Sequence, residues 1–308
     1  MYYLNPFSHF ARGSQPSVLN INFQTYIWPR FIFSEPLWIF RIKTPFRYSA
    51  DFEYGYKTIF EKLERLYISC GRKILGAYPT TSGLSVLVRL GWLPLEYRLA
   101  LNAIMWCMRI LNNKAGRTLN AFYSSINTDP LLLSHTATIQ PAIDFVNYLN
   151  NFSSENLFNI PFPRIKKAIQ IAMFSELSDY WKITDIGRHL FLIHKDWKPR
   201  RFSNKTFSRI TTCYYHSFAC GHGYLRARTF KYGICSSPDC RHGCNSPETA
   251  EHILLHCPFY NKERNMVLNA CNSHNLEISI GTFLSSNLIQ IPVERLLARF
   301  VNEVATDD

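Results

Sequence analysis

Four potential metal ligands lie within 18 residues of the C-terminal part of the sequence: Cys240, Cys244, His252 and Cys257. Structural zinc prefers four tetrahedral nitrogen and sulfur ligands, and a pair of closely spaced cysteines usually supplies the first two. Protein groups would fill all four positions and leave none open for a substrate. The spacing therefore predicts a structural zinc site rather than a catalytic one. The alternative is a set of ordinary buried cysteines in a histidine-rich loop.

Four neighbouring residues are further candidate ligands: Cys235, His222, His242 and His256. Cys235 could take the place of Cys240. His256 follows the expected helix turn, and we expect it to face solvent or to contact a ligand. His222 lies in a Gly-His-Gly turn, where packing or hydrogen bonding is the more ordinary function of a histidine.

The sequence around the ligands predicts a turn followed by a short helix. Ser246 is expected as the N-cap and Pro247 as the first helical residue. Glu248 and Glu251 would then lie in the first turn, where the helix dipole favours negative charge. Pro258 discourages the helix from continuing. We therefore expect a turn carrying the first two cysteines to face a helix carrying the histidine and the last cysteine.

Positive charge is concentrated in one segment, residues 161–232. The chain has a formal net charge of +12, and residues 164–231 contain 14 Lys and Arg against four Asp and Glu. This difference of +10 suits a polyanionic partner, of which nucleic acid is the commonest. A basic protein without such a partner is the alternative.

Basic and aromatic residues alternate within residues 195–202 of this segment. Lys and Arg neutralise phosphates, and exposed rings offer surfaces on which bases stack. The predicted contacts to RNA or DNA are Lys198, Arg200, Arg201, Arg226 and Arg228. The alternative is a basic loop whose Trp197 and Phe202 are buried.

Two blocks of the sequence resemble the same protein family. Cys240, Cys244, the run Glu248-Thr249-Ala250-Glu251-His252-Ile253-Leu254, Cys257-Pro258 and Arg264, preceded by Gly221-His222-Gly223-Tyr224-Leu225, carry the first block. It resembles the C-terminal zinc-knuckle region of reverse-transcriptase polyproteins from non-LTR, LINE-type, jockey-like arthropod retrotransposons. The family usually has two residues between the first cysteines, where this chain has three.

The second block comprises Leu63-Glu64-Arg65-Leu66, Gly76-Ala77-Tyr78-Pro79-Thr80-Thr81-Ser82, Leu84, Gly91, Pro94-Leu95-Glu96 and Arg98. It resembles the segment that follows the polymerase domain in these polyproteins, although the family usually has arginine where this chain has Pro79. The resemblance implies a zinc-binding and nucleic-acid-binding fragment, in a region thought to help hold template RNA in relatives.

The catalytic residues of that family are not found in the sequence. Polymerases of this class use a pair of aspartates on a hairpin, and the only Asp-Asp here is Asp307-Asp308. RNase H needs several carboxylates, but residues 112–160 contain only Asp129, Asp144 and Glu155. No endonuclease-like constellation occurs either. We therefore expect no enzyme activity and no small-molecule substrate. A zinc-stabilised protein-interaction module and an inert remnant are the alternatives.

Hydrophobic periodicity predicts a mainly α fold, a helical bundle-like linker followed by a small zinc-knuckle helical module. We divide the chain into an unassigned aromatic segment (1–50, strand or irregular), a helical post-polymerase segment (51–115), a polar connector (116–160), a basic helical segment (161–232), and the zinc knuckle with C-terminal helices (233–308). Helices are predicted at 51–76, 84–90, 94–111, 139–150, 163–181, 204–219, 260–270 and 293–304, with a turn at Gly281.

The chain shows no membrane-spanning or export signal. The aromatic run 26–40 is interrupted by two prolines, an arginine and a glutamate, and is shorter than the about 20 apolar residues that a span needs. The N-terminus lacks the pattern of a signal peptide. The nine cysteines are an odd number and mostly widely spaced, unlike a secreted disulfide framework. We therefore expect an intracellular protein, in the nucleus or cytoplasm.

Overall fold

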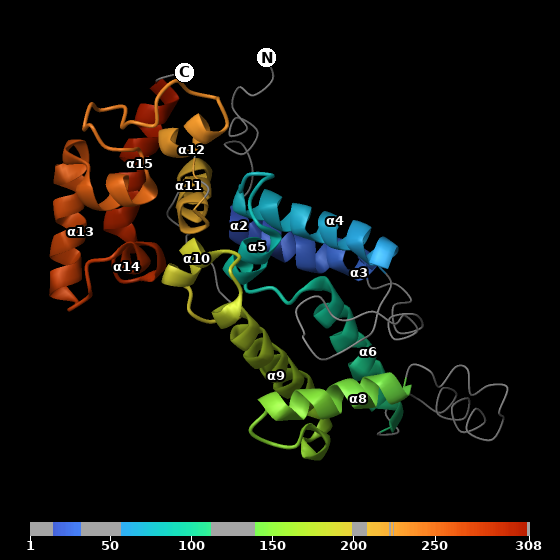
Figure 1. Ribbon diagram of the computed structural model, residues 1–308. Coiled ribbons are helices and arrows are strands. Elements are labelled where there is room, and N and C mark those ends of the chain that lie inside the picture. The colour runs from blue at the N-terminus through green and yellow to red at the C-terminus, as the bar shows by residue number, and fades with distance from the viewer. Residues whose placement is uncertain are drawn as a thin grey trace.

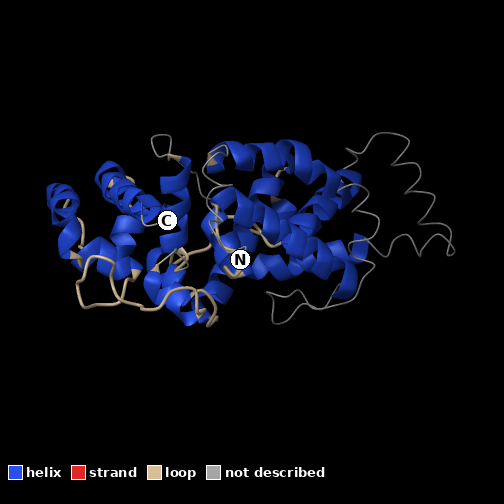
Figure 2. Cartoon of the chain, turned by 90° about the horizontal axis from the view of Figure 1, so that it is seen from above, coloured by secondary structure: helices blue, strands red, loops and turns tan. Residues whose placement is uncertain are grey.

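The computed structural model describes residues 15–31, 57–111, 139–198, 208–221, 223 and 225–306. Helices dominate these residues, and no strand occurs among them apart from an isolated antiparallel bridge between Asp239 and Pro247 (Figure 2). The predicted mainly α class is therefore confirmed. None of the described helices combines the length and apolar character needed to cross a membrane.

Figure 1 labels the α-helices and colours the chain in order of residue number. The order is α2 (Pro16–Asn22), the π-helical turn η1 (Phe23–Ile27), α3 (Trp28–Phe31), α4 (Lys57–Leu75), α5 (Gly83–Leu90), α6 (Leu95–Leu111), α8 (Ile139–Leu149), the 3-10 turns η4 (Asn150–Phe152) and η5 (Leu157–Asn159), α9 (Phe162–Ile183), α10 (Arg188–Ile193), α11 (Arg209–Ala219), α12 (Arg226–Lys231), the π-helical turn η6 (His252–His256), the 3-10 turn η7 (Pro258–Tyr260), α13 (Asn261–Ser273), α14 (Ile280–Ser285) and α15 (Gln290–Thr306).

The N-terminal segment is helical where it is described, so the expectation of strand or irregular structure is wrong for residues 16–31. Burial explains the helix: Phe23 stacks on Trp92 with ring centroids 4.7 Å apart, and Trp28 packs near Tyr67. The π-helical turn ends at Ile27, two residues before Pro29, which has no N–H to donate to the preceding turn. Such a local widening lets a helix continue past a proline.

Helices α8 and α9 meet α6 around one buried carboxylate. Glu176 on α9 accepts hydrogen bonds from the hydroxyl of Tyr97 on α6, at 2.8 Å, and from that of Tyr148 on α8, at 2.6 Å. Because buried carboxylates need hydrogen-bond partners, this contact fixes how the three helices meet. α9 then runs from this end of the molecule toward α10 (Figure 1).

A buried arginine joins the centre of the chain to its C-terminal part. Arg89 on α5 donates to Nδ1 of His216 on α11, at 3.0 Å, and to Nε2 of His194, at 2.6 Å. Its guanidinium also lies 5.0 Å from the ring centroid of Tyr215. Burial, together with the charge of Arg89, holds the pKa of His216 well below its ordinary value. A neutral imidazole can accept the arginine's hydrogen bond through Nδ1, whereas a second positive charge beside Arg89 would be unfavourable.

The C-terminal helices cover the loops that carry the candidate ligands. α15 packs against α13 and α11, and the rings of Tyr214, Phe218 and Tyr260 surround Phe300 on α15. These side chains belong to an apolar core that runs from the N-terminal helices to α15. The candidate ligands are therefore anchored to a packed helical layer.

Gly281 does not form the expected turn but lies inside the short helix α14. The side chain of Ser279 caps this helix by accepting a hydrogen bond from the N–H of Thr282, and Phe283 is buried. A Cβ atom at Gly281 would come within 3.0 Å of the carbonyl oxygen of Leu192. The glycine is thus explained by the close approach of α10 rather than by a turn.

Gly76, in the turn between α4 and α5, lies where both the backbone conformation and the packing favour glycine. Its φ of +64° is unfavourable for other residues, and a Cβ there would lie 2.1 Å from Sγ of Cys213. We predict that Gly76→Ala lowers the free energy of unfolding by about 2–4 kcal/mol, from backbone strain and overpacking. Gly233→Ala is the matched control, because Gly233 has φ +67° with nothing within 4 Å of the added atom. Urea denaturation should show the larger loss at Gly76; equal losses would contradict the packing argument.

Candidate metal centre

A tight loop presents the first two cysteines. The N–H of Cys240 donates to the carbonyl of Ser246, at 2.8 Å, and the N–H of Glu248 donates to the carbonyl of Pro238, at 2.9 Å. Between these bonds the chain reverses through Gly243, with φ +71°, and Asn245, with φ +51°. Both residue types tolerate left-handed backbone, which permits the sharp reversal. The loop thereby holds Cys240 and Cys244 on the same side.

The helix that carries His252 begins later than the sequence suggests. Helical structure starts at Ala250, so the predicted N-cap at Ser246 and first helical residue at Pro247 are wrong. Pro247 instead belongs to the isolated bridge. Thr249 caps the helix: its Oγ1 accepts from the N–H of His252, at 3.0 Å. Glu248 lies before the first turn and points into the loop, where Arg241 neutralises it.

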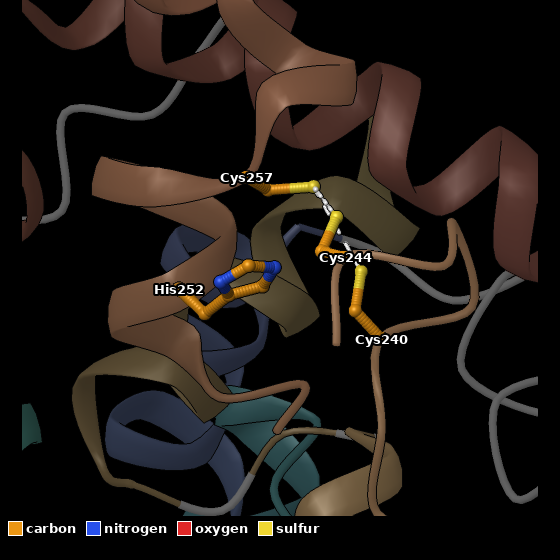
Figure 3. A group of neighbouring side chains, drawn as sticks. All are labelled: Cys240, Cys244, His252 and Cys257. Carbon is orange, nitrogen blue, oxygen red and sulfur yellow. Dashed lines mark hydrogen bonds between the residues drawn. The ribbon is translucent and has the colours of Figure 1, made fainter. Parts of the chain in front are cut away.

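The four predicted ligands converge on one point (Figure 3). One ligand atom from each of Cys240, Cys244, His252 and Cys257 can be chosen so that all four lie within 4.8 Å of one another. Sγ of Cys257 lies 3.8 Å from Sγ of Cys240 and 3.6 Å from Sγ of Cys244. A tetrahedral ion with zinc–sulfur bonds of about 2.3 Å separates its sulfur ligands by about 3.8 Å. The sulfur spacing therefore fits a metal and is far too long for a disulfide.

The environment of His252 is a second observation that fits a metal ion at the cluster. Its side chain is buried, and Nε2 has no hydrogen-bond partner among the described residues. An unsatisfied buried nitrogen is costly, and a metal ion is one group that satisfies it. Burial, followed by the charges of His256 and Arg264, lowers the pKa of His252. This keeps the imidazole neutral, which is the form that binds metals.

Burial also changes the pKa values of the cysteine thiols. It raises the pKa of Cys240 to about 12, and it raises the pKa of Cys257. Without a nearby cation these buried thiols stay protonated. A divalent cation reverses this preference, because it deprotonates the thiols that coordinate it. Three thiolates and one imidazole would then form a ligand set typical of structural zinc.

Arg264 on α13 braces the helical turn that carries His252. Its guanidinium donates to the carbonyls of Ile253, Leu254 and Cys257, the first two at 3.3 and 3.0 Å. The end of a helix leaves such carbonyls without internal partners. Arg264 thus satisfies them and fixes the position of Cys257. Sequence reasoning missed this contact, although Arg264 itself belongs to the motif that carries the family resemblance.

A buried ion pair fixes the cysteine loop from the other side. Arg241 donates Nε to Oε2 of Glu248, at 2.8 Å, and a terminal nitrogen to Oε1, at 2.9 Å. The backbone N–H of Arg226 donates to the same carboxylate, at 3.0 Å. Glu248 is completely buried. Burial alone would raise its pKa, but the hydrogen bonds and charge of Arg241, with the two backbone N–H groups, hold that pKa below its ordinary value.

The additional ligand candidates lie outside the cluster or beyond the described residues. Sγ of Cys235 contacts the carbonyls of Arg226 and Ser237, at 3.4 and 3.2 Å. His242 stacks on Phe259 with centroids 3.7 Å apart. His256 is exposed, as expected. His222 is not among the described residues. The structure thus offers Cys240, and not Cys235, as the first ligand.

The predicted nucleic-acid contacts are scattered and only partly described. Lys198 is exposed and pairs with Asp196 at 2.6 Å. Arg226 and Arg228 lie on α12, both half-buried. Arg200 and Arg201 lie outside the described residues.

Trp197 is completely buried, and its Nε1 donates to the carbonyl of Trp92 at 2.9 Å. The idea that this ring stacks on bases is therefore wrong, because a buried indole with a satisfied N–H packs the core. Phe202, the other ring considered there, lies outside the described residues.

Comparisons with known proteins return no match: no protein-family model fits the chain, and neither a curated protein nor a solved structure is significantly similar to it.

The ion pair of Arg241 and Glu248 predicts how the stability of the protein depends on pH. We expect Glu248→Gln to lower the free energy of unfolding by about 3–5 kcal/mol at pH 7, because it leaves Arg241, whose side chain is only 10% exposed, without its counter-charge. The folded pKa of Glu248 lies below its ordinary value of 4.5. Its stabilising effect is therefore complete above that pH and is lost as the pH falls through the folded pKa.

Chemical denaturation from pH 7 to pH 3 measures both effects. Glu248→Gln should remove part of the acid sensitivity of the wild type, whereas Glu251→Gln, at an exposed carboxylate nearby, should not. Identical pH profiles for the Glu248 variant and the wild type would contradict the assignment.

Proposed function

We propose that Cys240, Cys244, His252 and Cys257 bind one zinc ion that stabilises the C-terminal module. The observation that carries this proposal is the convergence of the four ligand atoms within 4.8 Å. Zinc is the favoured metal because three cysteines and one histidine form a complete tetrahedral set with soft sulfur ligands. The chemistry that the ion supplies is structural: it holds the cysteine loop against the helix of His252.

The ion would join three segments of the chain. Cys240 and Cys244 lie on a loop, His252 lies on η6, and Cys257 precedes η7. Tyr260 at the end of η7 is completely buried and packs beside Phe300 of α15. A metal that fixes Cys257 would therefore also fix the way the ligand loop meets α15. Structural zinc contributes on the order of 10 kcal/mol to the folding of such modules.

We further propose that the chain binds nucleic acid without catalysing a reaction, as a fragment derived from a retrotransposon reverse-transcriptase polyprotein. The support is the charge difference of +10 over residues 164–231. Several cations of this segment are exposed: Arg164, Lys166, Lys167, Lys195 and Lys231. The end of the segment, α12, is joined to the zinc module through the hydrogen bond between Arg226 and Glu248. The metal would thus stabilise the C-terminal end of the basic segment.

Metal content tests the first proposal. We predict about one zinc per purified chain, measured by plasma mass spectrometry, and loss of the metal in Cys244→Ser and His252→Ala. Cys235→Ser is the matched control and should keep its zinc, because Sγ of Cys235 bonds to backbone carbonyls outside the cluster. A folded wild type without metal, or loss of metal in Cys235→Ser, would contradict the ligand set.

Salt dependence tests the second proposal. Binding to a labelled RNA or DNA should weaken steeply with salt, since each neutralised phosphate adds about 0.7–0.9 to the slope of log K against log salt. The triple variant Lys198→Gln, Arg200→Gln and Arg201→Gln should reduce that slope by the equivalent of roughly two to three phosphate contacts. Lys62→Gln with Arg65→Gln, which removes exposed charge from α4, is the control and should change it less. Salt-independent binding, or no binding, would instead favour a protein-interaction module or an inert remnant.

A further inference from the structure

The chain after α12 presents three large apolar side chains to solvent within five residues. Phe230 is 45% exposed, Tyr232 57% and Ile234 48%, and Lys231 and Gly233 between them are exposed too. Exposed apolar residues are ordinary when single, but a contiguous group of them indicates a contact surface. We call Arg226, Arg228, Phe230, Lys231, Tyr232 and Ile234 the α12 surface.

Hydrogen bonds hold the α12 surface in a fixed conformation. The N–H of Gly233 donates to the carbonyl of Phe230, at 2.9 Å, and the N–H of Ile234 donates to that of Thr229, at 3.0 Å. Gly233 has φ +67°, so the helix ends in a left-handed glycine with the bond pattern of a Schellman motif. Sγ of Cys235 then contacts Thr229 Oγ1 at 3.1 Å. The rings are thus displayed without the entropy cost of ordering a loose loop on binding.

Positive charge alternates with the rings on the α12 surface. Residues 225–238 contain Arg226, Arg228 and Lys231 and no acidic residue. The guanidinium of Arg228 lies 5.5 Å from the ring centroid of Tyr232 and donates to its hydroxyl, at 3.1 Å. Arg228 also donates to the carbonyl of Gly221, at 3.2 Å. Its main effect is therefore to orient the ring of Tyr232, while Lys231, which lies between the two aromatic residues in the sequence, is exposed.

We propose that the α12 surface binds single-stranded nucleic acid, with unpaired bases stacked on Phe230 and Tyr232. This inference rests on the proposed nucleic-acid binding and names its preferred substrate. Aromatic rings beside Lys and Arg match the alternation of bases and phosphates in a strand. A duplex hides the base faces in its own stack, so it can use only the cations. The three cations supply the charge complementarity that selects this occupant over an uncharged partner.

The test measures fluorescence anisotropy of the zinc-loaded, full-length protein with a labelled oligonucleotide of about 12 nucleotides, a length that spans such a surface. The same sequence is measured as a single strand and as a duplex. We expect Phe230→Ala and Tyr232→Ala each to weaken single-strand binding roughly ten-fold and to leave duplex binding within about two-fold. Tyr232→Phe keeps the ring and should retain most of the affinity. Ile183→Ala, at an exposed apolar side chain on α9, is the control and should behave as the wild type.

Each other outcome contradicts a defined part of the account. Wild-type binding that Phe230→Ala and Tyr232→Ala do not change, or weaken equally on duplex and single strand, overturns the stacking proposal and leaves the proposed nucleic-acid binding intact. No wild-type binding to either form overturns both. Binding to anionic phosphatidylserine vesicles, lost in Phe230→Ala, without binding to the oligonucleotide would assign the α12 surface to a lipid headgroup layer. Unchanged zinc content and melting temperature of each variant exclude misfolding as the cause.

Discussion

The convergence of three cysteine sulfurs and one imidazole nitrogen is the constraint on which the C-terminal structure depends. Each side chain comes from a segment with little regular structure of its own: a loop, a single helical turn and the residue that follows that turn. Burial makes the thiols poor anions and leaves Nε2 of His252 without a protein partner. A bound cation would resolve both problems at once, because it would deprotonate the thiols and accept the imidazole lone pair. The surrounding contacts, Arg264 and the Arg241–Glu248 pair, hold these segments in place for it.

Several arginines are buried and have a structural function, which the net charge of the chain does not reveal. Arg89 bonds to two imidazoles, Arg209 donates to the carbonyls of Ile74 and Lys73 at the end of α4, and Arg264 donates to those around Cys257. A guanidinium suits these places, since its five donors can satisfy several acceptors in fixed directions. These cations contribute to the formal charge of +12 but cannot meet a phosphate. The surface available to a polyanion is therefore smaller and more localised than the composition suggests.

Sequence patterns predicted the long helices well, because their apolar periodicity matches the faces that are buried. The helix expected at 163–181 appears as α9, Phe162–Ile183, and the one expected at 139–150 as α8, Ile139–Leu149. Local signals were less reliable where a tertiary contact competed with them. Ser246-Pro247 has the composition of a helix start, but Pro247 bridges to Asp239 and the next residue, Glu248, pairs with Arg241. Gly281 resembles a turn residue, yet it serves the close approach to Leu192.

The candidate site, too, could be predicted from the sequence only in part. Spacing alone identified the four residues that converge, because metal ligands recur at short intervals on a turn and a helix. It could not identify Arg264 or the Arg241–Glu248 pair as their supports, since these contacts depend on how the chain folds back on itself. The sequence also did not show which aromatic residues are exposed. Trp197 was a candidate for stacking and is buried, whereas Phe230 and Tyr232, which the sequence analysis did not single out, are exposed.

X-ray absorption spectroscopy at the zinc edge of the purified protein tests the central claim most directly. The account predicts a first shell of three sulfur atoms at about 2.3 Å and one nitrogen at about 2.0 Å. It also predicts that His252→Ala, if it retains metal, loses the imidazole scattering. A shell of oxygen and nitrogen atoms, or one of four sulfurs, would contradict the ligand set of Cys240, Cys244, His252 and Cys257.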